Sequence, residues 1–221
     1  MHERSRQFAE LLWEANVVTF GDFVAKSGRR TPYFVNAGNF RRGQQLAQLG
    51  TFYADTIAER FGNQVDIVFG PAYKGIPLAV TTGIALASGH GHDVGVAFNR
   101  KEVKDHGEGG NIIGCVPGPH DRVVIVEDVT TAGTSIRETM PLLTANTDVN
   151  VVGLVVGVDR QERGQRSDRT ALDEIGDEFG IETVAIATIS EVVEHLGSDR
   201  IGENNVVRLR AYLEEYGPSG P

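Results

Sequence analysis

The chain has 221 residues, 40% of them hydrophobic and 23% charged, which is typical of one soluble globular enzyme domain with its own core. A formal net charge of -9 argues against a dedicated nucleic-acid-binding protein, because phosphate contacts need clustered Lys and Arg. The only cysteine, Cys115, excludes an internal disulfide, and the sequence offers neither a membrane span nor a signal peptide. We expect a single cytoplasmic domain over residues 1–221 that binds neither nucleic acid nor membrane.

The N-terminal part of the chain predicts a helix followed by extended segments. Apolar residues recur at helical spacing within residues 3–15, and residues 17–24 are extended in character. They lead into KSGRRTPYFVNAG at residues 26–38, where basic and hydroxyl side chains precede an aromatic run. On composition alone, that run also fits a solvated hairpin edge.

Strands and helices then alternate along the chain. We expect strands at 66–69, 94–98, 123–128, 151–158 and 183–188, and helices at 44–61, from after Pro77 to about 87, at 190–196 and at 201–216. A further helix begins near Ile136, and Pro141 should kink it or end it early. The alternation predicts an α/β fold with a mainly parallel twisted sheet flanked by helices. Lys74 follows the strand at 66–69 directly, which is where open α/β sheets bind ligands.

The most highly charged stretch, FNRKEVKDHGEGG, covers residues 98–110. Cationic groups followed by glycines predict a mobile lid that brings positive charge to an anion. A disordered surface loop and a metal site built on Asp105, His106 and Glu108 are alternatives. The histidines of SGHGHD at residues 88–93 favour a solvated turn over a metal site, because nothing nearby supplies further ligands.

The central stretch of the chain is VVIVEDVTTAGTS at residues 123–135. A buried strand delivers Glu127 and Asp128 to its carboxyl end, and a Thr/Gly loop then leads into a helix whose first N–H groups suit a phosphate monoester. The acids suit a ribose diol, or a divalent cation carried by the ligand. The stretch therefore predicts a site for ribose 5-phosphate, although an ordinary strand-loop-helix joint has the same pattern.

EDVTTAGTS at residues 127–135 resembles the phosphoribosyl diphosphate signature of type I phosphoribosyltransferases. FVAKSGRRTPYFVNAG, GPAYKGIP, FNRKEVKDHGEGG and VDRQERG resemble segments of the orotate phosphoribosyltransferase family. Two positions depart from the common pattern: Glu127 stands where a first Asp is frequent, and Val35 where a second Phe is frequent. The resemblance implies the type I phosphoribosyltransferase fold, with a small N-terminal hood over about residues 1–40 that sets the choice of base.

The resemblance also implies the activity and the site. The enzyme would transfer a phosphoribosyl group to orotate, with Mg²⁺ carried by the diphosphate and no direct protein ligand, in a homodimer whose lid completes the neighbouring site. Its catalytic residues would be Lys104, His106 and Asp128. Its phosphoribosyl diphosphate would contact Lys26, Tyr73, Lys74, Arg100, Lys101, Lys104, His106, Glu127, Asp128, Val129, Thr130, Thr131, Ala132, Gly133, Thr134 and Ser135. Its orotate would contact Phe34, Val35, Thr131 and Arg160.

Three alternatives stay open at this point. Arg160 could instead form a surface salt bridge with Glu162 or Asp159. The enzyme could act on another base, such as uracil or a purine. The same fold could also serve a non-catalytic regulator that senses phosphoribosyl diphosphate.

Overall fold

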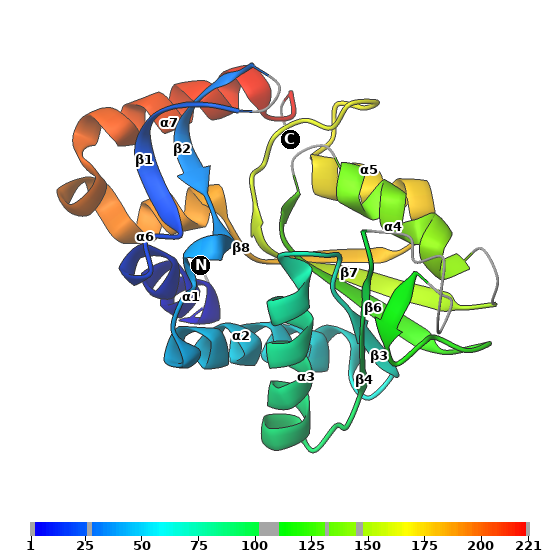
Figure 1. The fold of residues 1–221 in the computed structure, drawn as a ribbon. Coiled ribbons are helices and arrows are strands. Elements are labelled where there is room, and N and C mark those ends of the chain that lie inside the picture. Colours follow the sequence, from blue (N-terminus) through cyan, green and yellow to red (C-terminus); the bar gives the residue numbers. More distant parts are fainter. Residues whose placement is uncertain (1–2, 26–27, 102–110, 131–132, 145–147, 220–221) are drawn as a thin grey trace.

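The computed structural model describes residues 3–25, 28–101, 111–130, 133–144 and 148–219 (Figure 1). A six-stranded sheet forms the centre, in the order β5-β4-β3-β6-β7-β8. Five strands are parallel, and β5 pairs antiparallel with β4 at one edge. The strands are β3 (Ile67–Phe69), β4 (Gly95–Asn99), β5 (Ile112–Gly114), β6 (Arg122–Thr130), β7 (Asn150–Asp159) and β8 (Glu182–Thr188). The predicted α/β class with a mainly parallel sheet is confirmed.

Helices cover both faces of this sheet. The helices are α1 (Glu3–Glu14), α2 (Gly43–Phe61), α3 (Gly75–His90), α4 (Thr134–Thr144), α5 (Ala171–Phe179), α6 (Ile189–Ile201) and α7 (Glu203–Tyr216), with a short 3-10 turn at Ala37–Asn39. Alternate residues of a strand point to opposite faces, so Val124 and Val126 of β6 pack with α1, α2, α3 and α6. Ile125 packs on the other side with α4 and α5. No helix within the described residues is long and apolar enough to cross a bilayer.

A separate two-stranded sheet lies beside the C-terminal helix α7 (Figure 1). It consists of β1 (Val18–Val24) and β2 (Arg30–Val35), paired antiparallel. We call these two strands together with α7 the hood. Helix α1, in contrast, packs mainly with α6 and β8 of the main body. The hood therefore draws on both ends of the chain, and the boundary expected near residue 40 stays a prediction.

Four features differ from the expectations or were not foreseen. Helix α4 continues to Thr144, so Pro141 does not end it. The edge strand β5 and the helix α5 were not predicted from the sequence. The side chain of His90 lies 2.8 Å from Asp55 on the neighbouring helix α2, so it is more than a solvated turn residue.

Candidate active site

Two adjacent carboxylates lie near the end of β6, between β3 and β7. Glu127 and Asp128 are each only 8% exposed. The last two residues of the strand pair with β7: Val129 with Val158, and Thr130 with Asp159. The carboxyl ends of the parallel strands all lie on this side of the sheet, so loops from several strands converge around the two acids.

Glu127 is held on both its side chain and its main chain. The Ser135 hydroxyl donates a 2.7 Å hydrogen bond to Glu127 Oε2, and the Tyr53 hydroxyl donates one of 2.7 Å to the Glu127 carbonyl oxygen. Burial, and next the negative charge of Asp128, raise the pKa of Glu127 to about 7. Glu127 therefore changes its protonation state near neutral pH, within reach of the loop that begins α4.

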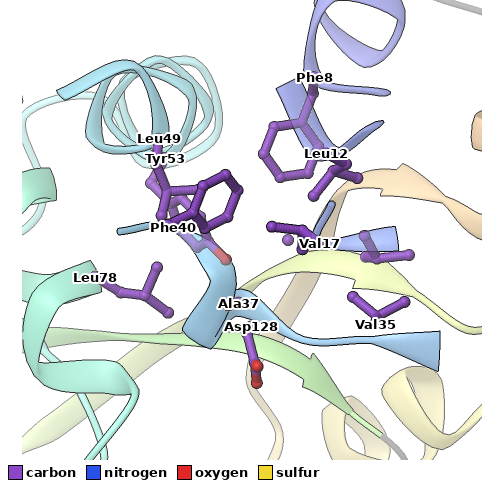
Figure 2. Close-up of a pocket in the computed structure, with 12 residues that line it drawn as sticks. Phe8, Leu12, Val17, Val35, Ala37, Phe40, Leu49, Tyr53, Leu78 and Asp128 are labelled. Carbon is purple, nitrogen blue, oxygen red and sulfur yellow. The ribbon is translucent and has the colours of Figure 1, made fainter. Parts of the chain in front are cut away.

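Asp128 faces the turn after β3. Lys74 Nζ lies 3.1 Å from Asp128 Oδ2, and the Val129 N–H donates a 2.9 Å hydrogen bond to Asp128 Oδ1. Figure 2 shows the carboxylate pointing away from the apolar side chains around Leu78 and Ala37. The cavity behind it is about 10 Å³, roughly the volume that one buried water occupies. Asp128 thus has an apolar back and a cationic front, which suits an acceptor for sugar hydroxyls.

The loop after β6 leads into α4 through a glycine that no other residue replaces easily. Gly133 has φ +67°, and a Cβ there would lie 2.8 Å from Ile175 Cδ1 and 2.9 Å from an Arg137 nitrogen. Thr134 and Ser135 follow as exposed residues of the first turn of α4. The unpaired N–H groups and the dipole at this helix start favour an anion. Thr131 and Ala132 of the predicted loop lie outside the described residues.

The helix α5 braces this loop from behind. Arg137 on α4 donates to Glu174 at 2.9 Å and pairs with Glu178. Glu174 also accepts hydrogen bonds from the backbone N–H groups of Arg166 and Ser167, at 2.7 and 3.0 Å. The start of α4 is therefore tied to the segment that follows β7.

The turn between β3 and α3 is very tight. A Cβ at Gly70 would lie 1.9 Å from the Gly75 carbonyl oxygen, so the two glycines permit the close approach. The turn exposes Tyr73, at 64%, and Lys74. The Ala72 N–H donates a 2.7 Å hydrogen bond to the side chain of Asn99 at the end of β4. Asn99 was not singled out from the sequence, although a polar side chain at the end of a parallel strand is the usual signal.

The predicted lid begins at the end of β4. The Arg100 N–H donates a 2.7 Å hydrogen bond to the Asn111 carbonyl oxygen, which closes the base of the segment. The Lys101 ammonium lies 5.7 Å from the centre of the Tyr73 ring. Lys101 therefore lies next to Tyr73 of the β3–α3 turn within one subunit, and the contribution of the lid to a neighbouring subunit's site stays a prediction. Lys104 and His106 lie outside the described residues, and so do Asp105 and Glu108 of the metal-site alternative.

The hood brings one aromatic side chain to its surface. Phe34 is 44% exposed and stacks on Phe23, with ring centres 5.7 Å apart. Val35, the next residue of β2, points to the opposite face and is buried against the core. Only the main chain of Val35 is left to contact a ligand beside Phe34. Lys26 lies outside the described residues.

Arg160 follows β7 directly and is buried. Its Nη2 donates to Glu162 Oε1 at 2.7 Å, and its guanidinium carbon lies 4.7 Å from the centre of the Tyr33 ring. The ion pair with Glu162 that the sequence left as an alternative is therefore present, but it is buried and not on the surface. The pair does not exclude a ligand contact, because arginine carries five N–H donors.

The described residues thus gather the acids, the helix start, Tyr73, Lys74, Arg100 and Lys101 along the carboxyl edge of one sheet. Residues 36–184 match the phosphoribosyl transferase domain family, which places the chain in that class of protein. The chain is 51% identical over 223 residues to the orotate phosphoribosyltransferase of Clostridium beijerinckii, with 98% of this chain and 99% of the relative covered. It is 45% identical over 225 residues to that of Bifidobacterium longum, with 96% and 97% covered.

The fold agrees with these sequence matches. The crystal structure of the Francisella tularensis orotate phosphoribosyltransferase superposes with a TM-score of 0.81 at 35% identity, covering 96% of this chain and 99% of that one. The chain belongs to the orotate phosphoribosyltransferase family. The resemblance drawn from the five sequence segments is confirmed, and so is the expected fold.

Proposed function

We propose that this protein transfers the 5-phosphoribosyl group from phosphoribosyl diphosphate to N1 of orotate. The products are orotidine 5'-phosphate and pyrophosphate, as in the biosynthesis of UMP in the cytoplasm. Family membership supports the activity. One observation supports the position of the proposed site most strongly. Glu127 and Asp128 lie near the end of β6, shortly before the glycine turn and the exposed start of α4.

In this proposal the start of α4 and the two acids bind different parts of the ribose 5-phosphate. The N–H groups from Gly133 to Ser135 and the positive end of the α4 dipole hold the phosphate. Glu127 and Asp128 accept hydrogen bonds from the ribose hydroxyls. The Ser135 hydroxyl can donate to only one partner at a time, so a bound phosphate competes with Glu127 for that proton. Phosphate binding thereby releases the carboxylate for the sugar.

The diphosphate lies on the other side of the acids, toward Tyr73 and Lys74. Lys26, Arg100, Lys101, Lys104 and His106 complete its positive surroundings in this proposal. In this proposal Mg²⁺ is carried by the diphosphate, with the adjacent acids at the end of β6 near it but with no direct protein ligand. Bound Mg²⁺ would neutralise charge on the departing pyrophosphate.

The reaction breaks the bond between the anomeric carbon and the diphosphate oxygen and forms a bond from that carbon to N1 of orotate, whose N1 proton leaves to pyrophosphate or to solvent. Positive charge develops on the ribose ring, and the negative charges of Glu127 and Asp128 stabilise it. Negative charge leaves with pyrophosphate, where Lys104 and His106 pair with it or protonate it. Phe34, the main chain of Val35, Thr131 and Arg160 contact the pyrimidine, and Arg160 suits its carboxylate.

Pyrophosphate release measured with phosphoribosyl diphosphate, Mg²⁺ and orotate tests the activity. We expect turnover with orotate and none with uracil or a purine base. Turnover of uracil but not of orotate would show that the acceptor is another base and not orotate. Binding of RNA or DNA without any turnover would reject the proposed enzyme activity and support a non-catalytic regulator.

We also propose that the lid of one subunit completes the site of its neighbour in a homodimer. Lys104→Ala and Asp128→Asn homodimers should then both be nearly inactive. Mixing equal amounts after dissociation should restore about a quarter of wild-type activity, because half of the dimers are mixed and each has one intact site. Confirmed subunit exchange without recovery of activity would refute the shared lid.

A further inference from the structure

Glu162 lies at the centre of a buried polar cluster between the hood and the main sheet. Its Oε1 accepts hydrogen bonds from Arg160 Nη2 at 2.7 Å, from the Tyr212 hydroxyl at 2.8 Å and from the Tyr33 hydroxyl at 3.2 Å. Its Oε2 accepts one from Arg29 Nη1 at 3.3 Å. The Glu162 side chain is only 3% exposed. We call these five residues the Glu162 cluster.

The cluster joins segments that lie far apart in the sequence. Arg29 immediately precedes β2, Tyr33 lies on β2, and Tyr212 lies on α7. Arg160 and Glu162 follow β7, at the edge where β7 pairs with the end of β6. One carboxylate therefore fixes the hood relative to the edge of the sheet that holds the ribose-binding acids.

Glu162 also fixes the direction of Arg160. Both Arg160 Nε, at 3.0 Å, and Nη2, at 2.7 Å, donate to the same Glu162 oxygen, and the guanidinium lies over the Tyr33 ring. One edge and one face of the guanidinium are thereby engaged. Its third nitrogen, Nη1, makes no hydrogen bond to any residue that the structure describes. Three N–H donors of a buried arginine, two on Nη1 and one on Nη2, are thus left for another acceptor.

The charges of the cluster point to the kind of acceptor. Two guanidinium groups face one carboxylate, and burial raises the pKa of Tyr33, so this hydroxyl stays neutral. The cluster therefore carries one positive charge in excess. Water solvates part of this charge, because the Arg29 side chain is 34% exposed, but the buried guanidinium edge of Arg160 matches a planar carboxylate in a bidentate hydrogen bond.

We propose that Glu162 is a positioning residue for substrate choice, which holds Arg160 so that its remaining edge receives the carboxylate of an acidic pyrimidine. This inference rests on the proposed function. Glu162 itself makes no contact with the substrate. It acts by orienting Arg160, and the same carboxylate also holds Tyr33 and Tyr212 of the hood.

The test compares the Michaelis constants of the two substrates in Glu162→Gln. The amide keeps the size of the side chain but loses the charge that orients Arg160. We expect the KM for orotate to rise by about tenfold or more, the loss of one charge-assisted hydrogen bond, and the KM for phosphoribosyl diphosphate to change by less than about twofold. Glu162→Asp keeps the charge on a shorter arm and should recover part of the orotate affinity.

Asp66→Asn is the matched control. Asp66 receives two hydrogen bonds of 2.9 Å from the Arg122 guanidinium, but at the starts of β3 and β6, the opposite edge of the sheet. Asp66→Asn should lower thermal stability and leave both Michaelis constants unchanged. A selective effect on orotate in Glu162→Gln alone then reports positioning and not general loss of packing.

The outcomes separate this inference from the proposed function. A wild-type protein that does not turn over orotate refutes the proposed function. A wild-type protein that does, together with a folded Glu162→Gln whose KM for orotate is unchanged or rises in parallel with that for phosphoribosyl diphosphate, overturns the positioning role alone. If Glu162→Gln does not fold, Tyr212→Phe decides: it removes one donor to Glu162 and no charge. A rise of about two- to threefold in the KM for orotate supports the inference, and no change overturns it.

Discussion

Glu127→Gln should make the protein more stable at pH 8 while it impairs the enzyme. The ionised carboxylate is buried beside a second acid, and the environment favours its protonated form. Glutamine has nearly the same shape as the protonated acid, and its carbonyl oxygen can still accept the 2.7 Å hydrogen bond from Ser135. The substitution therefore removes an unfavourable charge without leaving a cavity.

The magnitude follows from the pKa of Glu127, which burial and the charge of Asp128 raise from 4.5 to about 7. At about 1.4 kcal/mol per pKa unit, ionising this group costs roughly 3 kcal/mol more in the native state than in the unfolded chain. The native protein binds more protons than the unfolded chain between these two values, so its free energy of unfolding falls as the pH rises through that window. Below pH 4.5 both forms are neutral, and the wild-type protein and Glu127→Gln should be almost equally stable.

Urea unfolding at pH 5 and pH 8 measures the effect. We expect Glu127→Gln to gain roughly 2–3 kcal/mol over wild type at pH 8, or about 4–12 °C in melting temperature, and much less at pH 5. Glu138→Gln, which removes an exposed carboxylate from α4, controls for the loss of one acid. Equal gains for Glu127→Gln at both pH values would refute the raised pKa, and a loss of stability at pH 8 would refute the unfavourable burial.

Three further substitutions probe the loops around the acids. Gly133→Ala places a Cβ 2.8 Å from Ile175 at a positive φ and should cost roughly 1–3 kcal/mol of unfolding free energy, measured in urea. Lys74→Gln removes the cation nearest the ribose-binding acids and should lower kcat/KM for phosphoribosyl diphosphate by about tenfold to a hundredfold, with the KM for orotate unchanged. Asn99→Ala leaves the Ala72 N–H without its partner and should cost about 1 kcal/mol, with a several-fold rise in the KM for phosphoribosyl diphosphate.

Each of these results has a contrary outcome. Wild-type stability of Gly133→Ala would mean that the turn tolerates a side chain. An unchanged kcat/KM in Lys74→Gln would refute the proposed contact between Lys74 and the diphosphate. A loss of stability in Asn99→Ala without any change in KM would reduce Asn99 to a structural role.

The main sheet and the acidic strand could be predicted because their signals are local. Apolar runs identify parallel strands, and Glu127 and Asp128 fall at the end of one of them. Helix α4 shows the limit of a local rule. Pro141 removes one hydrogen bond, but the helix continues for three more residues and buries Leu143 against the sheet. Packing outweighs the local cost there.

The support around the site was beyond sequence reasoning because its partners are distant in the chain. The contact between Glu162 and Tyr33 spans 129 positions, and the one between Tyr53 and Glu127 spans 74. No spacing rule connects such residues. The helix α5 was missed although its signals are local: Thr170 caps its start, acidic residues lie in its first turn, and Leu172 and Ile175 recur at helical spacing.

The pairing of β2 with α7 has a consequence for how the protein becomes active during synthesis. The sheet and its acidic strand are complete once β8 has been made, but the hood awaits the last helix. Under the proposed function, a chain without α7 would therefore have the acidic strand and the start of α4 but would lack part of the hood that lies over the base. Fusions or truncations at the C-terminus should accordingly disturb the selection of the acceptor before they disturb the binding of the donor.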